Sequence, residues 1–94
     1  MLKELDPLLH SQLRLAIMSI LLSVDEADFV YLKEQTGATA GNLSVQIEKL
    51  ATAEYIEVTK EFVGKKTRTS CRITDKGRMA FETYVNDLKT YLNL

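Results

Sequence analysis

The first half of the chain carries hydrophobic residues at the three- and four-residue spacing of α-helices. The segment from Leu8 to Ser23 is strongly apolar, which predicts a long and largely buried helix. A short second helix is expected between Asp28, a candidate N-cap, and Gly37, a residue type that commonly ends helices. Thr39 can then cap a third helix from about Ala40 to Ala53. The second and third helices, joined by a tight turn that contains glycine, form a candidate helix-turn-helix.

The second half changes to the two-residue period of β-strands and then returns to a helix. Apolar and polar residues alternate from Tyr55 to Val63, and a second alternation follows after a glycine. These two segments predict a β-hairpin whose tip is Gly64 to Thr67. Thr74 or Asp75 can cap a last helix that reaches about Leu92. The predicted order of helix, helix, helix, hairpin and helix makes the fold class α+β, mainly α.

Length and composition limit the organisation of the chain. Ninety-four residues correspond to one domain, so we expect a single domain over residues 1–94. Hydrophobic residues make up 46% and charged residues 27%, which is close to the average for soluble globular proteins. The apolar runs are far shorter than the roughly 20 residues of a membrane span. With one cysteine and no signal-peptide pattern, the expected location is the cytoplasm.

The charge of the chain is unevenly distributed. The formal net charge of −1 argues against a nucleic-acid partner, because domains that bind nucleic acid usually carry a basic excess. Residues 55–78, however, contain seven basic and three acidic side chains, whereas residues 1–54 contain four basic and eight acidic ones. The hairpin region is therefore basic on its own, and a DNA partner remains compatible with the net charge of −1.

Four short motifs within Gly37 to Arg78 resemble the winged helix-turn-helix regulators of bacteria and archaea, in particular the MarR-like and ArsR-like families. The motifs are GNLS at Gly41 to Ser44, Glu48-Lys49-Leu50, FVGKK at Phe62 to Lys66, and ITDKGR at Ile73 to Arg78. The resemblance implies three helices, a β-hairpin wing and a C-terminal helix. It also implies that the third helix enters the DNA major groove and that the wing contacts the backbone or the minor groove. The larger MarR-like proteins carry further helical sequence that this chain does not have.

The third predicted helix has two chemically different sides. Leu43, Ile47 and Leu50 form an apolar side that suits a core. Asn and Gln can pair with adenine, a Val methyl group can touch a thymine methyl group, and Lys can reach phosphate or guanine. Free N–H groups and the Thr39 hydroxyl at the helix start favour phosphate. Glu48 is excluded from the site because its carboxylate would repel phosphate. The candidate DNA-binding residues are Thr39, Gly41, Asn42, Ser44, Val45, Gln46 and Lys49 on the helix, and Lys65, Lys66 and Arg68 on the hairpin.

Apolar residues at both ends of the chain suggest a partner. Those of the last helix recur at alternating three- and four-residue steps, which is the spacing of a helix-pairing seam. In the resembled families the first and last helices commonly form a two-fold dimer, so terminal helices for dimerisation are expected. The alternative is that this stripe packs only on the chain's own first helix. The candidate dimer-interface residues are Leu2, Leu5, Leu9, Phe81, Tyr84, Leu88 and Tyr91.

Several residues have ordinary structural explanations. A polar outer face occurs on any surface helix, and lysines at a hairpin tip also keep proteins soluble. Cys71 lies on the alternating face with Thr69 and Ile73, which predicts a buried structural thiol, and His10 is expected to make a local hydrogen bond. These two residues are far apart, whereas zinc sites need three or four protein ligands. We therefore expect no metal, no cofactor and no enzymatic activity.

The residues and the resemblance together predict a transcriptional regulator that binds specific duplex-DNA sequences as a homodimer. A small-molecule effector is possible, and its identity is not readable from the sequence. The alternative hypothesis is a winged helix that serves as a protein–protein interaction module without DNA binding, which the net negative charge keeps open.

Overall fold

The computed structural model describes residues 2–93, and it contains the predicted helices and hairpin in the predicted order. The helices are α1 (Gln12–Leu22), α2 (Phe29–Thr36), α3 (Ala40–Thr52) and α4 (Asp75–Leu92), and the strands are β1 (Ala27–Asp28), β2 (Ile56–Val63) and β3 (Lys66–Ile73). These elements confirm the predicted fold class, α+β and mainly α. We call the β2–β3 hairpin the wing.

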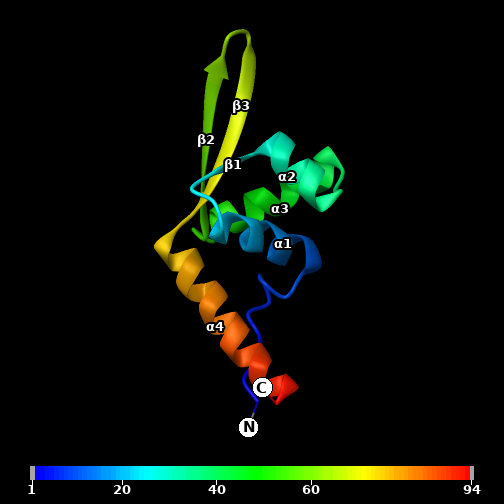
Figure 1. Cartoon of the computed structure of the whole chain (residues 1–94), viewed down its shortest axis with the longest axis vertical. Coiled ribbons are helices and arrows are strands. Elements are labelled where there is room, and N and C mark those ends of the chain that lie inside the picture. The colour runs from blue at the N-terminus through cyan, green and yellow to red at the C-terminus, as the bar shows by residue number, and fades with distance from the viewer. Residues whose placement is uncertain (1, 94) are drawn as a thin grey trace.

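The molecule is long and narrow, with principal extents of 54 × 25 × 21 Å. Figure 1 shows the wing projecting from one end and α4 running toward the other, with α1, α2 and α3 grouped between them. The N-terminal segment and the end of α4 lie side by side at the end opposite the wing tip, where Tyr91 contacts Lys3. The predicted DNA-binding hairpin and the predicted dimer residues of α4 are therefore at opposite ends of the molecule.

The three-stranded sheet has the order β1-β3-β2, and both pairings are antiparallel. Ala27 of β1 pairs with Cys71, and the register of the wing runs from Ile56 opposite Ile73 to Val63 opposite Lys66. The sequence did not predict β1, because two residues are too few to show a period. Pairing on both sides makes β3 the central strand.

The core lies where the three grouped helices meet the base of the sheet. The predicted inner side of α3 is confirmed, since its three apolar residues are buried. Burying one leucine side chain of this kind contributes about 1.5–3 kcal/mol. Other elements supply the rest of the core, which includes Cys71, the thiol that was predicted to be buried. The buried hydrophobic residues are Leu9, Ile17, Met18, Leu21, Ala27, Leu32, Leu43, Ile47, Leu50, Ile56, Cys71 and Tyr84.

The first helix begins later than predicted. Residues 7–10 form a separate turn, in which the Asp6 carbonyl oxygen accepts hydrogen bonds from the N–H groups of Leu9 and His10. The Asp6 side chain also accepts a hydrogen bond from the N–H of Leu8 at 2.9 Å. The backbone then becomes extended at Ser11, with φ −151° and ψ 128°, which separates this turn from α1, so that α1 begins only at Gln12.

Two other sequence predictions need correction. The turn of the wing is shorter than expected, because Lys66 already belongs to β3 and the turn consists of Gly64 and Lys65, with Gly64 at a φ of 67°. The imidazole of His10 does not bond locally. Its Nδ1 lies 3.0 Å from the hydroxyl oxygen of Tyr84, 74 residues away in the sequence.

Candidate nucleic-acid interface

The turn between α2 and α3 is built as the sequence predicted. Asp28 caps α2 by accepting a hydrogen bond from the N–H of Tyr31 at 2.8 Å, and Gly37 ends that helix at a φ of 70°. The Thr39 hydroxyl then caps α3 by accepting a hydrogen bond from the N–H of Asn42 at 3.2 Å. Three residues therefore separate the two helices, and this short connection fixes the start of α3 at the surface.

Most candidate residues of α3 face solvent. Those that the structure leaves exposed are Thr39, Gly41, Asn42, Ser44, Val45 and Lys49. The side chain of Val45 is 48% accessible, so its methyl groups are available for contact. Gln46 differs from the others because it is half-buried. The structure thus brings six of the seven α3 candidates together on one accessible surface.

Gln46 is half-buried because Arg14 of α1 holds it. The Arg14 Nη1 donates a hydrogen bond to Gln46 Oε1, and the Arg14 Nε donates one to the carbonyl oxygen of Leu8 at 2.6 Å. Gln46 Nε2 in turn donates to Asn42 Oδ1 at 3.0 Å. A chain of hydrogen bonds therefore runs from the N-terminal turn through α1 to two candidate base-reading residues. No local sequence pattern singles out Arg14, because only the fold brings α1 next to α3.

The three candidate cations of the wing differ in their surroundings. Lys65 and Lys66 lie at the exposed tip, and no carboxylate among residues 2–93 pairs with either. Arg68 does have partners: its Nε lies 3.5 Å from Asp28 Oδ2 and its Nη1 lies 3.9 Å from Glu61 Oε1. The two lysines are therefore freer to contact phosphate than Arg68, whose charge is already partly balanced.

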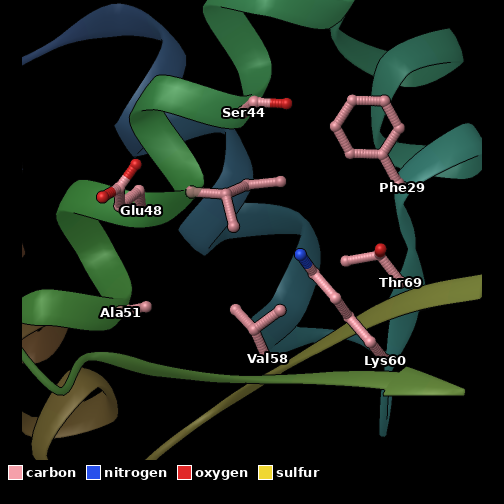
Figure 2. Close-up of a pocket in the computed structure, with 8 residues that line it drawn as sticks. Phe29, Ser44, Glu48, Ala51, Val58, Lys60 and Thr69 are labelled. Carbon is pink, nitrogen blue, oxygen red and sulfur yellow. The ribbon is translucent and has the colours of Figure 1, made fainter.

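A groove of about 660 Å³ separates α3 from the wing. Figure 2 shows Lys60 extending from β2 into this groove, with Ser44 and Glu48 of α3 across from it. The groove is lined by Phe29, Ser44, Ile47, Glu48, Ala51, Val58, Lys60 and Thr69. Lys60 was not among the predicted site residues, although alternation along β2 puts it on the same face as Val58. That alternation is the signal by which it could have been found.

The candidate dimer residues fall into three groups. Leu9 and Tyr84 are buried within the chain itself, at 0% and 4% exposure, so we reassign these two from the interface to the core. Leu5, Phe81 and Leu88 are half-buried, and Leu2 and Tyr91 are exposed. The Tyr91 hydroxyl donates a hydrogen bond to the Lys3 carbonyl oxygen at 2.6 Å, which holds the N-terminal segment against the end of α4.

Metal-ligating side chains and the cysteine thiol are the other groups of the described chain that could carry chemistry. Within residues 2–93 no group of three or more His, Cys, Asp or Glu side chains is arranged to hold a metal ion. Burial raises the pKa of the Cys71 thiol to about 11, which keeps this thiol protonated and unreactive at neutral pH. No helix within residues 2–93 is long and apolar enough to cross a membrane.

Comparisons with known proteins agree with this geometry. Residues 13–92 match the family described as winged helix DNA-binding domain. The uncharacterized protein MJ0432 of Methanocaldococcus jannaschii is 33% identical over 79 residues, which cover 84% of this chain and 86% of that protein. The structure of a transcriptional regulator homologue from Pyrococcus horikoshii is 28% identical, with a TM-score of 0.83 over 92% of this chain and 85% of that chain.

A more distant structure shows how far the fold extends. YusO of Bacillus subtilis has a TM-score of 0.78 at 14% identity, which shows a common fold. The match covers 88% of this chain but 58% of that one, so this chain spans little more than half the length of YusO.

Proposed function

Because the chain belongs to the winged helix DNA-binding family, we propose that it is a transcriptional regulator that binds specific duplex-DNA sequences as a homodimer. Membership of a DNA-binding family agrees with the prediction that the chain is not an enzyme. One observation carries the proposal: the exposed side of α3 stands beside a projecting wing whose tip lysines have no carboxylate partner among residues 2–93.

The proposed roles follow from the chemistry of each residue. Asn42, Ser44, Val45, Gln46 and Lys49 read base edges in the major groove, and Thr39 and Gly41 bring the start of α3 close to phosphate. Lys65 and Lys66 contact phosphate from the wing, with Arg68 as a weaker third contact. We propose that residues 1–94 act as one domain. A regulator of this bacterial and archaeal type meets its DNA in the cytoplasm, which is the proposed location.

Salt dependence tests the DNA contact. Genomic fragments that the protein selects supply the site, and affinity is then measured from low to moderate salt. Removing two phosphate contacts with Lys65→Ala/Lys66→Ala should lower the salt slope by about two. The control Lys33→Ala/Lys89→Ala removes the same charge from α2 and α4 and should leave the slope unchanged. Absence of duplex-DNA binding at low salt would reject the proposal and favour a protein-interaction module.

The homodimer rests on the apolar surface at the end of α4. Leu2, Tyr91 and Leu92 are 54%, 42% and 58% exposed, and the half-buried side chains Leu5 and Leu88 add to this surface. Contiguous apolar surface of this kind marks contact sites on small proteins. A second copy related by a two-fold axis would cover it and present two α3 helices to a palindromic site.

Sedimentation tests this interface. Tyr91→Glu puts a charge into the apolar surface and should convert a dimeric mass to a monomeric one at micromolar concentration. Asn86→Glu adds the same charge on a different side of α4 and should leave the dimer intact. A wild-type protein that sediments as a monomer at this concentration contradicts the homodimer.

A further inference from the structure

The groove between α3 and the wing has the size and lining of a small-molecule site. Its volume of about 660 Å³ lies within the range of roughly 300–1,000 Å³ that is usual for pockets that bind small ligands. Its walls come from α3, from Phe29 at the start of α2, and from both strands of the wing. A single copy of the chain therefore contains the whole groove.

Most of the lining is apolar. Phe29, Ala51 and Val58 are half-buried, and Ile47 is buried at 6% exposure. We call these four residues the apolar floor. Ile47 belongs to the core, so packing from below holds this part of the floor in place. Covering apolar surface that still faces water is favourable, and the floor therefore favours a ligand with an apolar body.

Two opposite charges stand on different elements at the edge of the apolar floor. Lys60 extends from β2 into the groove, and Glu48 of α3 lies across from it (Figure 2). Both residues are exposed, and neither takes part in an ion pair within residues 2–93. The groove is therefore neutral overall, with its positive and negative groups held apart.

This combination limits what the groove can hold. A phosphate group would meet Lys60 but would be repelled by the Glu48 carboxylate. A simple carboxylic acid would likewise leave Glu48 without a partner, and a simple amine would leave Lys60 without one. A ligand with a carboxylate, an ammonium group and an apolar body satisfies both charges and the floor together. These are the three parts of an amino acid with an apolar side chain.

We infer that the groove between α3 and the wing binds a free amino acid with an apolar side chain. The carboxylate of the ligand accepts hydrogen bonds from the Lys60 ammonium group, and its ammonium group donates to the Glu48 carboxylate. Its side chain lies against the apolar floor, and the Ser44 and Thr69 hydroxyl groups offer further hydrogen bonds. This site goes beyond the proposed function, because it requires neither DNA nor a second copy of the chain.

A set of related ligands tests the proposed chemistry. Phenylpropionate and phenylethylamine keep the ring of L-phenylalanine but lack its ammonium and its carboxylate group, respectively. L-Phenylalanine should bind wild type with a dissociation constant of about 1 mM or lower, and each analogue at least about tenfold more weakly, because a charged contact is lost. Free glycine keeps both charges without the apolar body and should also bind more weakly than L-phenylalanine.

NMR titration of the isotopically labelled protein measures these affinities and locates the ligand. Saturable shifts on addition of L-phenylalanine or L-leucine should concentrate at the backbone amides of groove residues such as Ser44, Ala51 and Thr69. The amides of α4, which lines no part of the groove, should stay unchanged.

Charge-removing variants test the two polar contacts. Lys60→Met and Glu48→Gln should each weaken L-phenylalanine binding about tenfold. In Lys60→Met the preference for L-phenylalanine over phenylethylamine should also disappear, because the ligand carboxylate has lost its partner. The controls Lys89→Met on α4 and Glu57→Gln on the opposite face of β2 remove the same charges outside the groove and should bind as wild type does. Unchanged unfolding temperatures would show that the variants remain folded.

Three outcomes would overturn the inference. In the first, neither L-phenylalanine nor L-leucine shifts the groove amides. In the second, phenylpropionate binds wild type as tightly as L-phenylalanine does. In the third, the Lys89 and Glu57 variants lose as much affinity as the groove variants. The salt series tests DNA binding separately, so each of these outcomes leaves the proposed function standing, and absence of DNA binding leaves the amino-acid site standing.

Discussion

Arg14 changes what the two amide side chains of α3 can offer to a base. The Asn42 and Gln46 oxygens already accept hydrogen bonds, from Gln46 Nε2 and Arg14 Nη1 respectively. Their remaining N–H groups are donors. A bidentate contact with adenine needs one donor and one acceptor, whereas guanine presents two acceptors, N7 and O6, in the major groove. Because an amide oxygen has two lone pairs, both residues can still make the adenine contact that the sequence suggested, and the hydrogen bonds fix the orientation in which each amide meets a base.

Arg14→Lys tests this arrangement without altering the net charge. The planar guanidinium of Arg14 donates at once to the Leu8 carbonyl oxygen and to Gln46. The single ammonium group of a lysine lacks this fixed pair of donors and cannot make both contacts. Discrimination between the selected DNA site and sites with one changed base should fall about fivefold, the equivalent of one lost hydrogen bond. Affinity for unrelated DNA should stay the same, because phosphate contacts supply it. Competition binding with single-base variants measures both quantities.

A double-mutant cycle separates positioning from a direct DNA contact by Arg14. If Arg14 acts by orienting Gln46, then Arg14→Lys should have little further effect once Gln46→Ala is present. Losses of discrimination that add fully in the double variant would contradict a positioning role.

Among the elements, α4 starts against the base of the wing at very close range. Thr74 caps α4 by accepting a hydrogen bond from the N–H of Gly77 at 3.0 Å, and its own N–H donates to the Tyr55 carbonyl oxygen at 3.0 Å. Gly77 is buried against that same carbonyl group, so a Cβ atom added there would lie 2.1 Å from the Tyr55 oxygen. Close packing against the Tyr55 backbone therefore explains why the ITDKGR motif has a glycine at position 77.

The same substitution at two glycines should have opposite effects. Gly77→Ala should lower the free energy of unfolding by about 1–3 kcal/mol, because the backbone of Tyr55 or the start of α4 must move. Gly41→Ala, where an added Cβ meets nothing within 4 Å, should raise it by up to about 1 kcal/mol through better helix propensity. Urea unfolding measures both. Equal effects at the two positions would show that close packing at Gly77 is not what matters.

The elements with strong local signals were predictable from the sequence. Gly37, Thr39 and Thr74 act as the sequence indicated, because capping and helix ends depend on near neighbours in the chain. The start of α1 was not predictable in this way, since the extended backbone at Ser11 separates the turn that begins at Asp6 from α1. The strand β1 was missed because its two residues become a strand only by pairing with β3.

The candidate site was predictable at its exposed residues and not where distant segments meet. A helical wheel identified Asn42 and Val45 as outward-facing, because that depends only on the period of α3. The contact of Arg14 with Gln46 spans 32 residues, and the ion pair of Arg68 with Asp28 spans 40. No local pattern encodes such contacts, so the role of Arg14 and the partial neutralisation of Arg68 required the fold.

Across the whole molecule, tyrosine hydroxyl groups fasten the N-terminal segment to distant elements. The Tyr55 hydroxyl donates a hydrogen bond to Asp6 Oδ2 at 2.6 Å, and the Tyr91 hydroxyl donates one to the Lys3 carbonyl oxygen at 2.6 Å. Figure 1 shows this segment passing from the helices toward the end of α4. The proposed dimer surface therefore combines both ends of the chain, and its shape depends on these contacts.

The Tyr55 contact makes stability sensitive to alkaline pH. Burial, and then the hydrogen bond to Asp6 and the negative charge of Asp6, raise the pKa of Tyr55 from 10 to about 12. The native state thus holds the phenolic proton more tightly than the unfolded state does. The resulting stabilisation is fully present below pH 10 and is lost as the pH rises through about 12. Burial of Cys71 adds a similar loss between about pH 9 and 11.

Tyr55→Phe isolates the tyrosine contribution. At pH 8 the variant should be less stable than wild type by about 1 kcal/mol, because it lacks the hydrogen bond to Asp6. As the pH rises above 10, only wild type loses the stabilisation linked to the Tyr55 proton, so its advantage over the variant should shrink. Urea unfolding at a series of pH values measures the difference, from which the titration of Cys71 cancels because both proteins contain it. A difference that stays constant up to pH 11.5 would mean that the Tyr55 hydroxyl does not link proton binding to folding.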